Sequence, residues 1–146
     1  MLMTDDKWVD IIHFSKKESW GDWRKMDERI FIYLDAMREY AGVPFIVHCG
    51  YELAGHTINS QHYLGNAIDG HFENMPLIDQ YVIAERFPWS GIGVYPDWRS
   101  VGLHLDTRLI ENNMGSRWAC KNNDIGDPEY CNLDSDLFEY IIYNGV

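Results

Sequence analysis

Segment 27–49 constrains the fold most, because a helical pattern ends there abruptly and an apolar run follows it. Residues 27–41 read DERIFIYLDAMREYA, with apolar side chains recurring every three or four positions, as on the buried face of a helix. Asp27 is placed to cap this helix, and Gly42 and Pro44 are placed to end it. Residues 44–49, PFIVHC, have the short apolar pattern of a buried strand. These residues predict one helix and one buried strand.

The rest of the chain carries similar short patterns and no internal repeat. We predict a loop at 50–61, strands at 66–72, 91–95 and 101–107, a helix at 75–87 capped by Asn74, and a last helix or strand at 136–143. The length of 146 residues suits one domain, so we treat 1–146 as a single unit. The predicted fold class is α+β, with helices packed on a small, mainly antiparallel sheet.

Composition excludes several classes of partner. The formal net charge is −11, and no cluster of Lys and Arg is visible, so we expect no binding to nucleic acid or to anionic lipid. No run of 18 apolar residues is present, which predicts no membrane span. The start, MLMTDDKW, lacks the basic and apolar regions of a signal peptide. We therefore expect cytoplasmic synthesis, with a separate release route if the protein acts elsewhere.

The three cysteines do not form a disulfide framework, because their number is odd. Cys49 is the third cysteine, and Cys120 and Cys131 could pair across a short loop, but we expect free thiols.

The segment 60–69, SQHYLGNAID, is the most informative for chemistry. His62 and Asp69 are separated by Gly65, which permits a turn that brings them together. His104 lies in a later predicted strand, and Asp106, two residues on, shares its face. Two imidazoles and one carboxylate suit zinc, and three protein ligands leave a fourth position for water.

The order SQHYLGNAID and then GIGVYPDWRSVGLHLDTR resembles the M15 family of zinc D-Ala-D-Ala carboxypeptidases and peptidoglycan peptidases. That family shows S-x-H-x-x-G-x-A-x-D, followed by G-x-G-x-Y-P and H-x-D, and the similarity covers roughly residues 24–118. The resemblance implies a Hedgehog/D-Ala-D-Ala peptidase-like fold and Zn²⁺ bound by His62, Asp69 and His104. It also implies that peptidoglycan stem peptides are the partners.

The sequence departs from this family at two positions. Many members have Arg after the Gly-Tyr that follows the first strand, where this chain has Glu52. Several members place an acidic general base three residues before the last zinc ligand, where this chain has Val101. Asp106 is then the first candidate base and Asp97 the second. Asp106 could instead orient a ligand histidine, as partners of zinc ligands commonly do.

Other side chains near the motifs are candidates for contacts with substrate. Arg108, with Arg99 and Lys25 as alternatives, could replace the missing arginine. His71 would share a face with Asp69, and His56 lies in the loop that leads to the site. The indoles of Trp89, Trp98 and Trp118 flank the motifs and could line a groove.

Two interpretations of function remain. The first is zinc-dependent hydrolysis of a peptide bond in bacterial peptidoglycan, as a D,D-carboxypeptidase or endopeptidase of the kind carried by lytic phage proteins. The second is a zinc-binding module without catalysis, which serves as a phage structural or wall-binding protein. Glu52 and Val101 favour the second interpretation.

Overall fold

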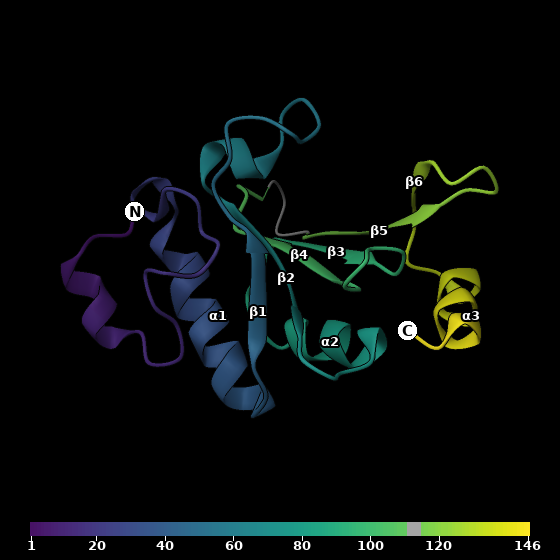
Figure 1. Cartoon of the computed structure of the whole chain (residues 1–146), viewed down its shortest axis with the longest axis horizontal. Coiled ribbons are helices and arrows are strands. Elements are labelled where there is room, and N and C mark those ends of the chain that lie inside the picture. The colour runs from purple at the N-terminus through teal and green to yellow at the C-terminus, as the bar shows by residue number, and fades with distance from the viewer. Residues whose placement is uncertain (111–114) are drawn as a thin grey trace.

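The computed structural model describes residues 1–110 and 115–146. Within these residues, a six-stranded, mostly antiparallel sheet packs against helices, which confirms the predicted α+β class (Figure 1). The spatial order of the strands is β1-β2-β4-β3-β5-β6, and only the β3–β5 pair is parallel. The strands are β1 (Phe45–Cys49), β2 (Ala67–Phe72), β3 (Gly91–Tyr95), β4 (Gly102–Asp106), β5 (Ser116–Asn122) and β6 (Pro128–Cys131).

Helix α1 (Glu28–Ala41) forms as predicted. The Asp27 side chain accepts a hydrogen bond from the backbone N–H of Arg29, and Gly42 ends the helix in the left-handed conformation at φ 70°. Burial of Ile30, Phe31, Leu34 and Met37 ties this helix to the core. Helix α3 (Ser135–Asn144) resolves the open choice for the C-terminal segment, and Asp134 caps it through the N–H of Leu137.

Helix α2 (Leu77–Ala84) is shorter than the predicted 75–87, and the predicted cap is wrong. Pro76 occupies the N-cap position, and Asn74 adopts a left-handed conformation at φ 55° outside the helix. The physical reason is Pro76, whose ring disfavours helical backbone at the preceding Met75.

The two strands β5 and β6 were not predicted from sequence. β5 pairs with β3, and β6 extends the sheet toward α3 at the right of Figure 1. Among the described residues, three short 3-10 segments add to the fold: η1 (Asp6–Asp10), η2 (Trp23–Lys25) and η3 (Gln61–Leu64). No helix in this part of the chain is long and apolar enough to cross a membrane.

The two faces of the sheet differ in character because side chains alternate along each strand. Ile68 of β2, Ile92 of β3 and Leu105 of β4 belong to the hydrophobic core, together with residues of α1 and α2. Asp69 and His104 occupy alternate positions in β2 and β4, so they point to the opposite face. The core therefore anchors the strands from one side and leaves the other side for polar chemistry.

Candidate metal centre and cleft

Asp69 and His104 are brought together by strand pairing. They are direct partners in the antiparallel register of β2 and β4. Side chains opposite each other in such a pair lie within contact distance. The carboxylate oxygen Oδ1 of Asp69 lies 2.8 Å from Nδ1 of His104. The sheet itself thus positions two of the three predicted ligands.

The third ligand, His62, is positioned by η3. Ser60 caps this turn by accepting a hydrogen bond from the N–H of His62 at 3.3 Å. Gly65 ends it in the left-handed conformation at φ 71°. A Cβ at Gly65 would lie 1.9 Å from the carbonyl oxygen of Lys25, so only glycine fits there. The predicted turn between His62 and Asp69 is confirmed.

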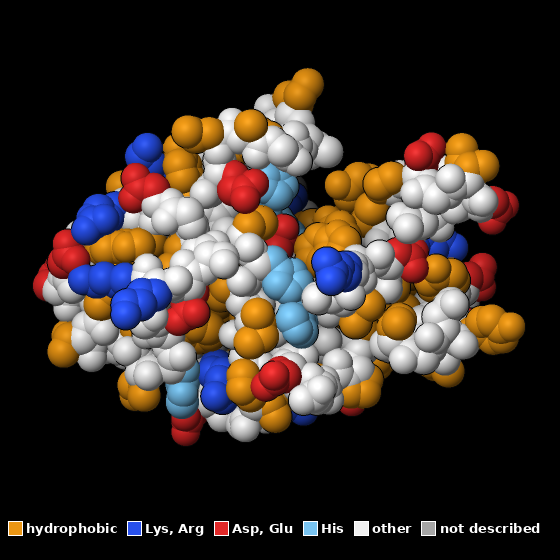
Figure 2. Space-filling view, in the orientation of Figure 1, with side chains coloured by type: hydrophobic (Ala, Val, Ile, Leu, Met, Phe, Trp, Pro, Cys, Tyr) orange, Lys and Arg blue, Asp and Glu red, His pale blue; other side chains and the backbone are white. Residues whose placement is uncertain are grey.

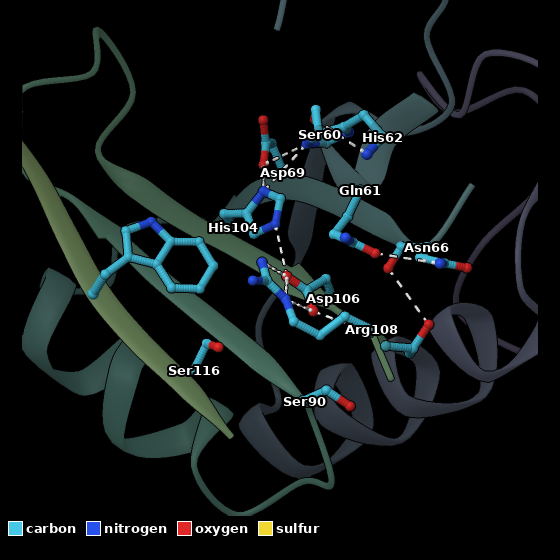
Figure 3. Close-up of polar contacts among 12 residues, drawn as sticks. Ser60, Gln61, His62, Asn66, Asp69, Ser90, His104, Asp106, Arg108 and Ser116 are labelled. Atoms are coloured by element: carbon cyan, nitrogen blue, oxygen red, sulfur yellow. Dashed lines mark hydrogen bonds and ion pairs between the residues drawn. The ribbon is translucent and has the colours of Figure 1, made fainter. Parts of the chain in front are cut away.

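The three predicted ligands converge on one point (Figure 3). Nε2 of His62 lies 3.2 Å from Nδ1 of His104 and 3.2 Å from Oδ1 of Asp69. Zinc–ligand bonds of 2.0–2.2 Å in tetrahedral geometry separate ligand atoms by roughly 3.3 Å. All three side chains are buried, with exposed fractions of 7% or less. The donor set and its spacing therefore fit a divalent cation such as zinc.

Each histidine is oriented through its other ring nitrogen. Nδ1 of His62 donates to the carbonyl oxygen of Gly50 at 2.7 Å. Nε2 of His104 donates to Oδ2 of Asp106 at 3.1 Å. Such outer hydrogen bonds fix the ring orientation and the tautomer of a ligand histidine. His62 and His104 are thus held with one nitrogen each toward the common point.

The charges of this cluster are strongly coupled. Burial alone would lower the pKa of His104, but hydrogen bonds to Asp106 and Asp69 outweigh burial and raise it to about 9. Burial alone would raise the pKa of Asp69, yet hydrogen bonds from His104 and His62 hold it well below its usual range. Without a metal ion, a protonated His104 lies between two carboxylates. The centre is therefore built to hold positive charge.

Asp106 lies behind His104 and does not line the cleft. Its side chain is fully buried, and Nε of Arg108 donates to its two oxygens at 2.8 and 2.9 Å. Burial would raise its pKa, but hydrogen bonds to His104 and Arg108 lower it to about 2. A Cβ at Gly91 would lie 2.2 Å from Oδ2 of Asp106, so the glycine of β3 makes room for this carboxylate. This placement favours the orienting role over the general-base role.

A cleft of about 640 Å³ opens above the cluster. In Figure 2 it appears as a hollow between the loop that follows β1 and the lobe formed by β5 and β6. Tyr95 and Trp98 stack on each other at 4.0 Å between ring centroids, and the indole of Trp118 donates to the Tyr95 hydroxyl at 3.2 Å. The described residues that line the cleft include Gln61, Tyr95, Trp98, Arg108, Trp118 and Tyr130.

The candidate substrate-binding residues separate into two groups. His56 and Arg108 line the cleft. His71 lies outside the lining of the cleft, where its Nδ1 contacts Nε2 of His48 at 2.6 Å. Among the flanking indoles, Trp98 and Trp118 line the cleft, whereas Trp89 is buried in the core.

The two positions that replace family residues have distinct surroundings. Glu52 lies 3.0 Å from Nε2 of His56 through Oε2. Val101 packs against the hydrophobic core. Asp97, the second candidate base, accepts hydrogen bonds from the Tyr140 hydroxyl at 2.8 Å and from the N–H of Asn122 at 2.6 Å. These bonds tie Asp97 to α3 and β5, away from the cluster.

Two glycines of β3 make room for side chains of the site, a role that the sequence analysis did not assign to them. Gly91 faces Asp106, and a Cβ at Gly93 would lie 2.6 Å from the indole of Trp118. The signal was the alternation G-x-G in a predicted strand, since a strand glycine often marks a close approach.

Comparison of the chain with protein-family models finds no match, and comparison with curated proteins finds none either.

Proposed function

We propose that the protein is a zinc-dependent hydrolase that cuts a peptide bond in bacterial peptidoglycan. The observation that carries this proposal is the convergence of His62, Asp69 and His104, with ligand atoms 2.8–3.2 Å apart at the floor of a cleft. The resemblance of the surrounding sequence to the M15 family supports the reaction and the substrate class.

The chain's own residues would have two roles, metal binding and positioning of a ligand. His62, Asp69 and His104, which all line the cleft, would hold the ion there. Zinc, when bound, supplies Lewis-acid polarisation of a carbonyl and lowers the pKa of a bound water. Asp106 acts as a positioning residue, because it holds the ring of His104 and is itself fixed by Arg108.

Arg108 is the best candidate for the cation that recognises a substrate carboxylate. Among the described residues that line the cleft, it is the only Lys or Arg. Its guanidinium lies 5.0 Å from the ring centroid of Trp118, which orients it beside the metal centre. A stem peptide ends in a carboxylate, which would bind the guanidinium N–H groups of Arg108 that Asp106 does not use. Trp98 and Tyr95 offer flat surfaces for the apolar parts of such a chain.

One observation favours the second candidate function, a wall-binding module without catalysis. Of the described residues that line the cleft, Asp69 is the only carboxylate, and it belongs to the metal cluster. A carboxylate that shuttles protons would need access to the substrate. Asp106 lacks that access because it is fully buried.

A turnover assay distinguishes the two functions. The zinc-loaded protein is incubated with whole peptidoglycan and, separately, with short peptides that end in D-Ala-D-Ala, each with and without a chelator. Hydrolysis that the chelator abolishes supports the enzyme. An undetectable rate on both substrates, with zinc bound, contradicts it and leaves the binding module. Both substrates are needed because Glu52 replaces the arginine that would recognise a free carboxylate.

A further inference from the structure

A thiol and two imidazoles gather directly beside the metal centre. Sγ of Cys49 lies 3.9 Å from Nδ1 of His62 and 4.0 Å from Nε2 of His56. One ligand atom from each of these residues lies within 4.8 Å of the others. Zinc–sulfur and zinc–nitrogen bonds separate tetrahedral ligand atoms by roughly 3.5 Å, so shifts on the order of half an ångström would bring the thiol to both imidazoles at that spacing.

A β-bulge places Cys49 in this position. In the β1–β2 pair, Val47 is opposite Gly70, but the next partner, Asp69, is opposite Cys49 and not His48. The extra residue re-aims the side chains at the end of β1, as bulges near functional sites commonly do. The thiol therefore faces Asp69, and it donates to Oδ2 at 3.4 Å.

His56 is held in place although its loop is largely exposed. The backbone N–H of His56 donates to the Tyr63 hydroxyl at 2.9 Å, and that hydroxyl donates to the backbone carbonyl oxygen of His56 at 2.7 Å. Its ring stacks on His62 at 4.1 Å between centroids, with an interplanar angle of 7°. Tyr63 thus fixes the backbone of His56, and stacking on His62 holds the imidazole next to the thiol.

We propose that Cys49, His56 and His62 form a second cation site, which takes a thiophilic divalent ion and shares His62 with the first centre. Nδ1 of His62 faces the second site, while Nε2 faces Asp69 and His104. Thiolate and imidazole ligands select zinc, cobalt or cadmium over magnesium and calcium. Oε2 of Glu52, 3.0 Å from Nε2 of His56, adds a carboxylate that balances the charge.

The second site binds more weakly than the first. Its occupation releases two protons to solvent: the Nδ1 proton of His62, now donated to the carbonyl oxygen of Gly50, and the thiol proton of Cys49, now donated to Asp69. With both ions bound, His62 bridges them as an imidazolate. Occupation also requires Sγ of Cys49 and Nε2 of His56, now 4.0 Å apart, to move closer together. The second site rests on the proposed function, because both cation sites use His62. Its test must therefore distinguish failure of the second site from failure of the proposed function.

Cobalt titration followed by absorption spectroscopy provides that test, because only a thiolate ligand gives a near-ultraviolet charge-transfer band. In the parent protein we expect the visible bands of the first centre to appear before the charge-transfer band. Cys49→Ser and His56→Ala should lose the charge-transfer band and keep the visible bands of the first equivalent. Cys131→Ser, a matched thiol control outside the cleft lining, should keep both. His104→Ala should show the charge-transfer band from the first equivalent.

Three results of the cobalt titration decide whether the second site exists. No charge-transfer band at excess cobalt in folded parent protein overturns the second site. A band that survives Cys49→Ser also overturns it, because another thiol is then the ligand. A band that depends on Cys49 and His56, without any absorption that depends on His104, keeps the second site and contradicts the proposed function. His56→Ala alters a partly exposed loop residue, so it stays informative if Cys49→Ser fails to fold.

Discussion

The two ligand groups share His62 but are held by different parts of the molecule. Asp69 and His104 come from paired central strands, with the hydrophobic core on the other side of the sheet. Cys49 ends a bulged edge strand, and His56 lies in the exposed loop that follows. The first group has ligand atoms 2.8–3.2 Å apart, whereas the second has them at 3.9–4.0 Å. Strand pairing thus brings the first group of candidate ligand atoms to the spacing that a metal ion requires, whereas the loop leaves the second group wider apart.

The largest expected difference between the groups is in zinc-dependent stability. Binding to the folded state at free zinc 100 times the dissociation constant adds about 2.7 kcal/mol, or roughly 5–10 °C in Tm for a chain of this size. His104→Ala should reduce that rise to the smaller contribution of the weaker Cys49–His56–His62 site, and His56→Ala should keep it in full. Thermal unfolding with and without zinc measures both. A full rise in His104→Ala would show that the strand-borne group is not the principal site.

The next largest effect is expected for the residue that orients His104. Asp106→Asn should weaken zinc affinity by roughly 10–100-fold, as loss of an outer hydrogen-bond partner does, and activity should return at excess zinc. Asp97→Asn is the control and should leave affinity unchanged. If Asp106 is instead the general base, hydrolysis falls by ~10²–10⁴-fold while zinc stays bound. Competition titration against a zinc chelator, together with turnover, separates these outcomes.

A smaller effect is expected where β3 approaches the centre. Gly91→Ala places a Cβ 2.2–2.6 Å from the Asp106 carboxyl atoms. Overpacking of this kind costs about 1–3 kcal/mol of unfolding free energy, and zinc affinity should fall as Asp106 moves. Adding Asp106→Ala removes the crowded atoms, so the two changes should not be additive. Denaturant unfolding of the single and double variants measures this coupling, and strict additivity would contradict the packing argument.

The smallest effect is expected at the cap of η3. Ser60→Ala removes one hydrogen bond of 3.3 Å to the N–H of His62. Loss of a cap costs about 0.5–2 kcal/mol, and a long, partly exposed bond belongs at the lower end. Zinc affinity should change little, because Gly50 still orients the ring of His62. A loss as large as that of Asp106→Asn would show that the cap, and not the sheet, determines the geometry.

Much of the first group could be predicted from the sequence, because local signals specify it. The helical period and caps gave α1, and alternation in β2 and β4 placed Asp69 and His104 on one face. The motif around Gly65 gave the turn that carries His62. The free state of the three cysteines was also expected and is confirmed.

The second group was not predictable, because it depends on tertiary placement. The sequence of residues 48–56, HCGYELAGH, does not indicate the β-bulge that turns Cys49 toward Asp69. It also does not indicate the hydrogen bond between Tyr63 and the backbone of His56. The strands β5 and β6 were missed for a related reason. Their residues are largely exposed or half-buried, so they lack the apolar pattern that marks a core strand. Trp118 reaches the cleft only because β5 pairs with β3 opposite Gly93.

X-ray absorption spectroscopy at the zinc edge, on protein loaded with one equivalent of zinc, tests directly whether the strand-borne residues hold the metal ion. We expect nitrogen and oxygen ligands at roughly 2.0–2.2 Å from zinc, with the outer scattering of two imidazoles, from His62 and His104. A zinc–sulfur distance of roughly 2.3 Å at this loading would contradict this expectation. That result would place the first metal ion at Cys49, in the loop-borne group rather than on the paired strands.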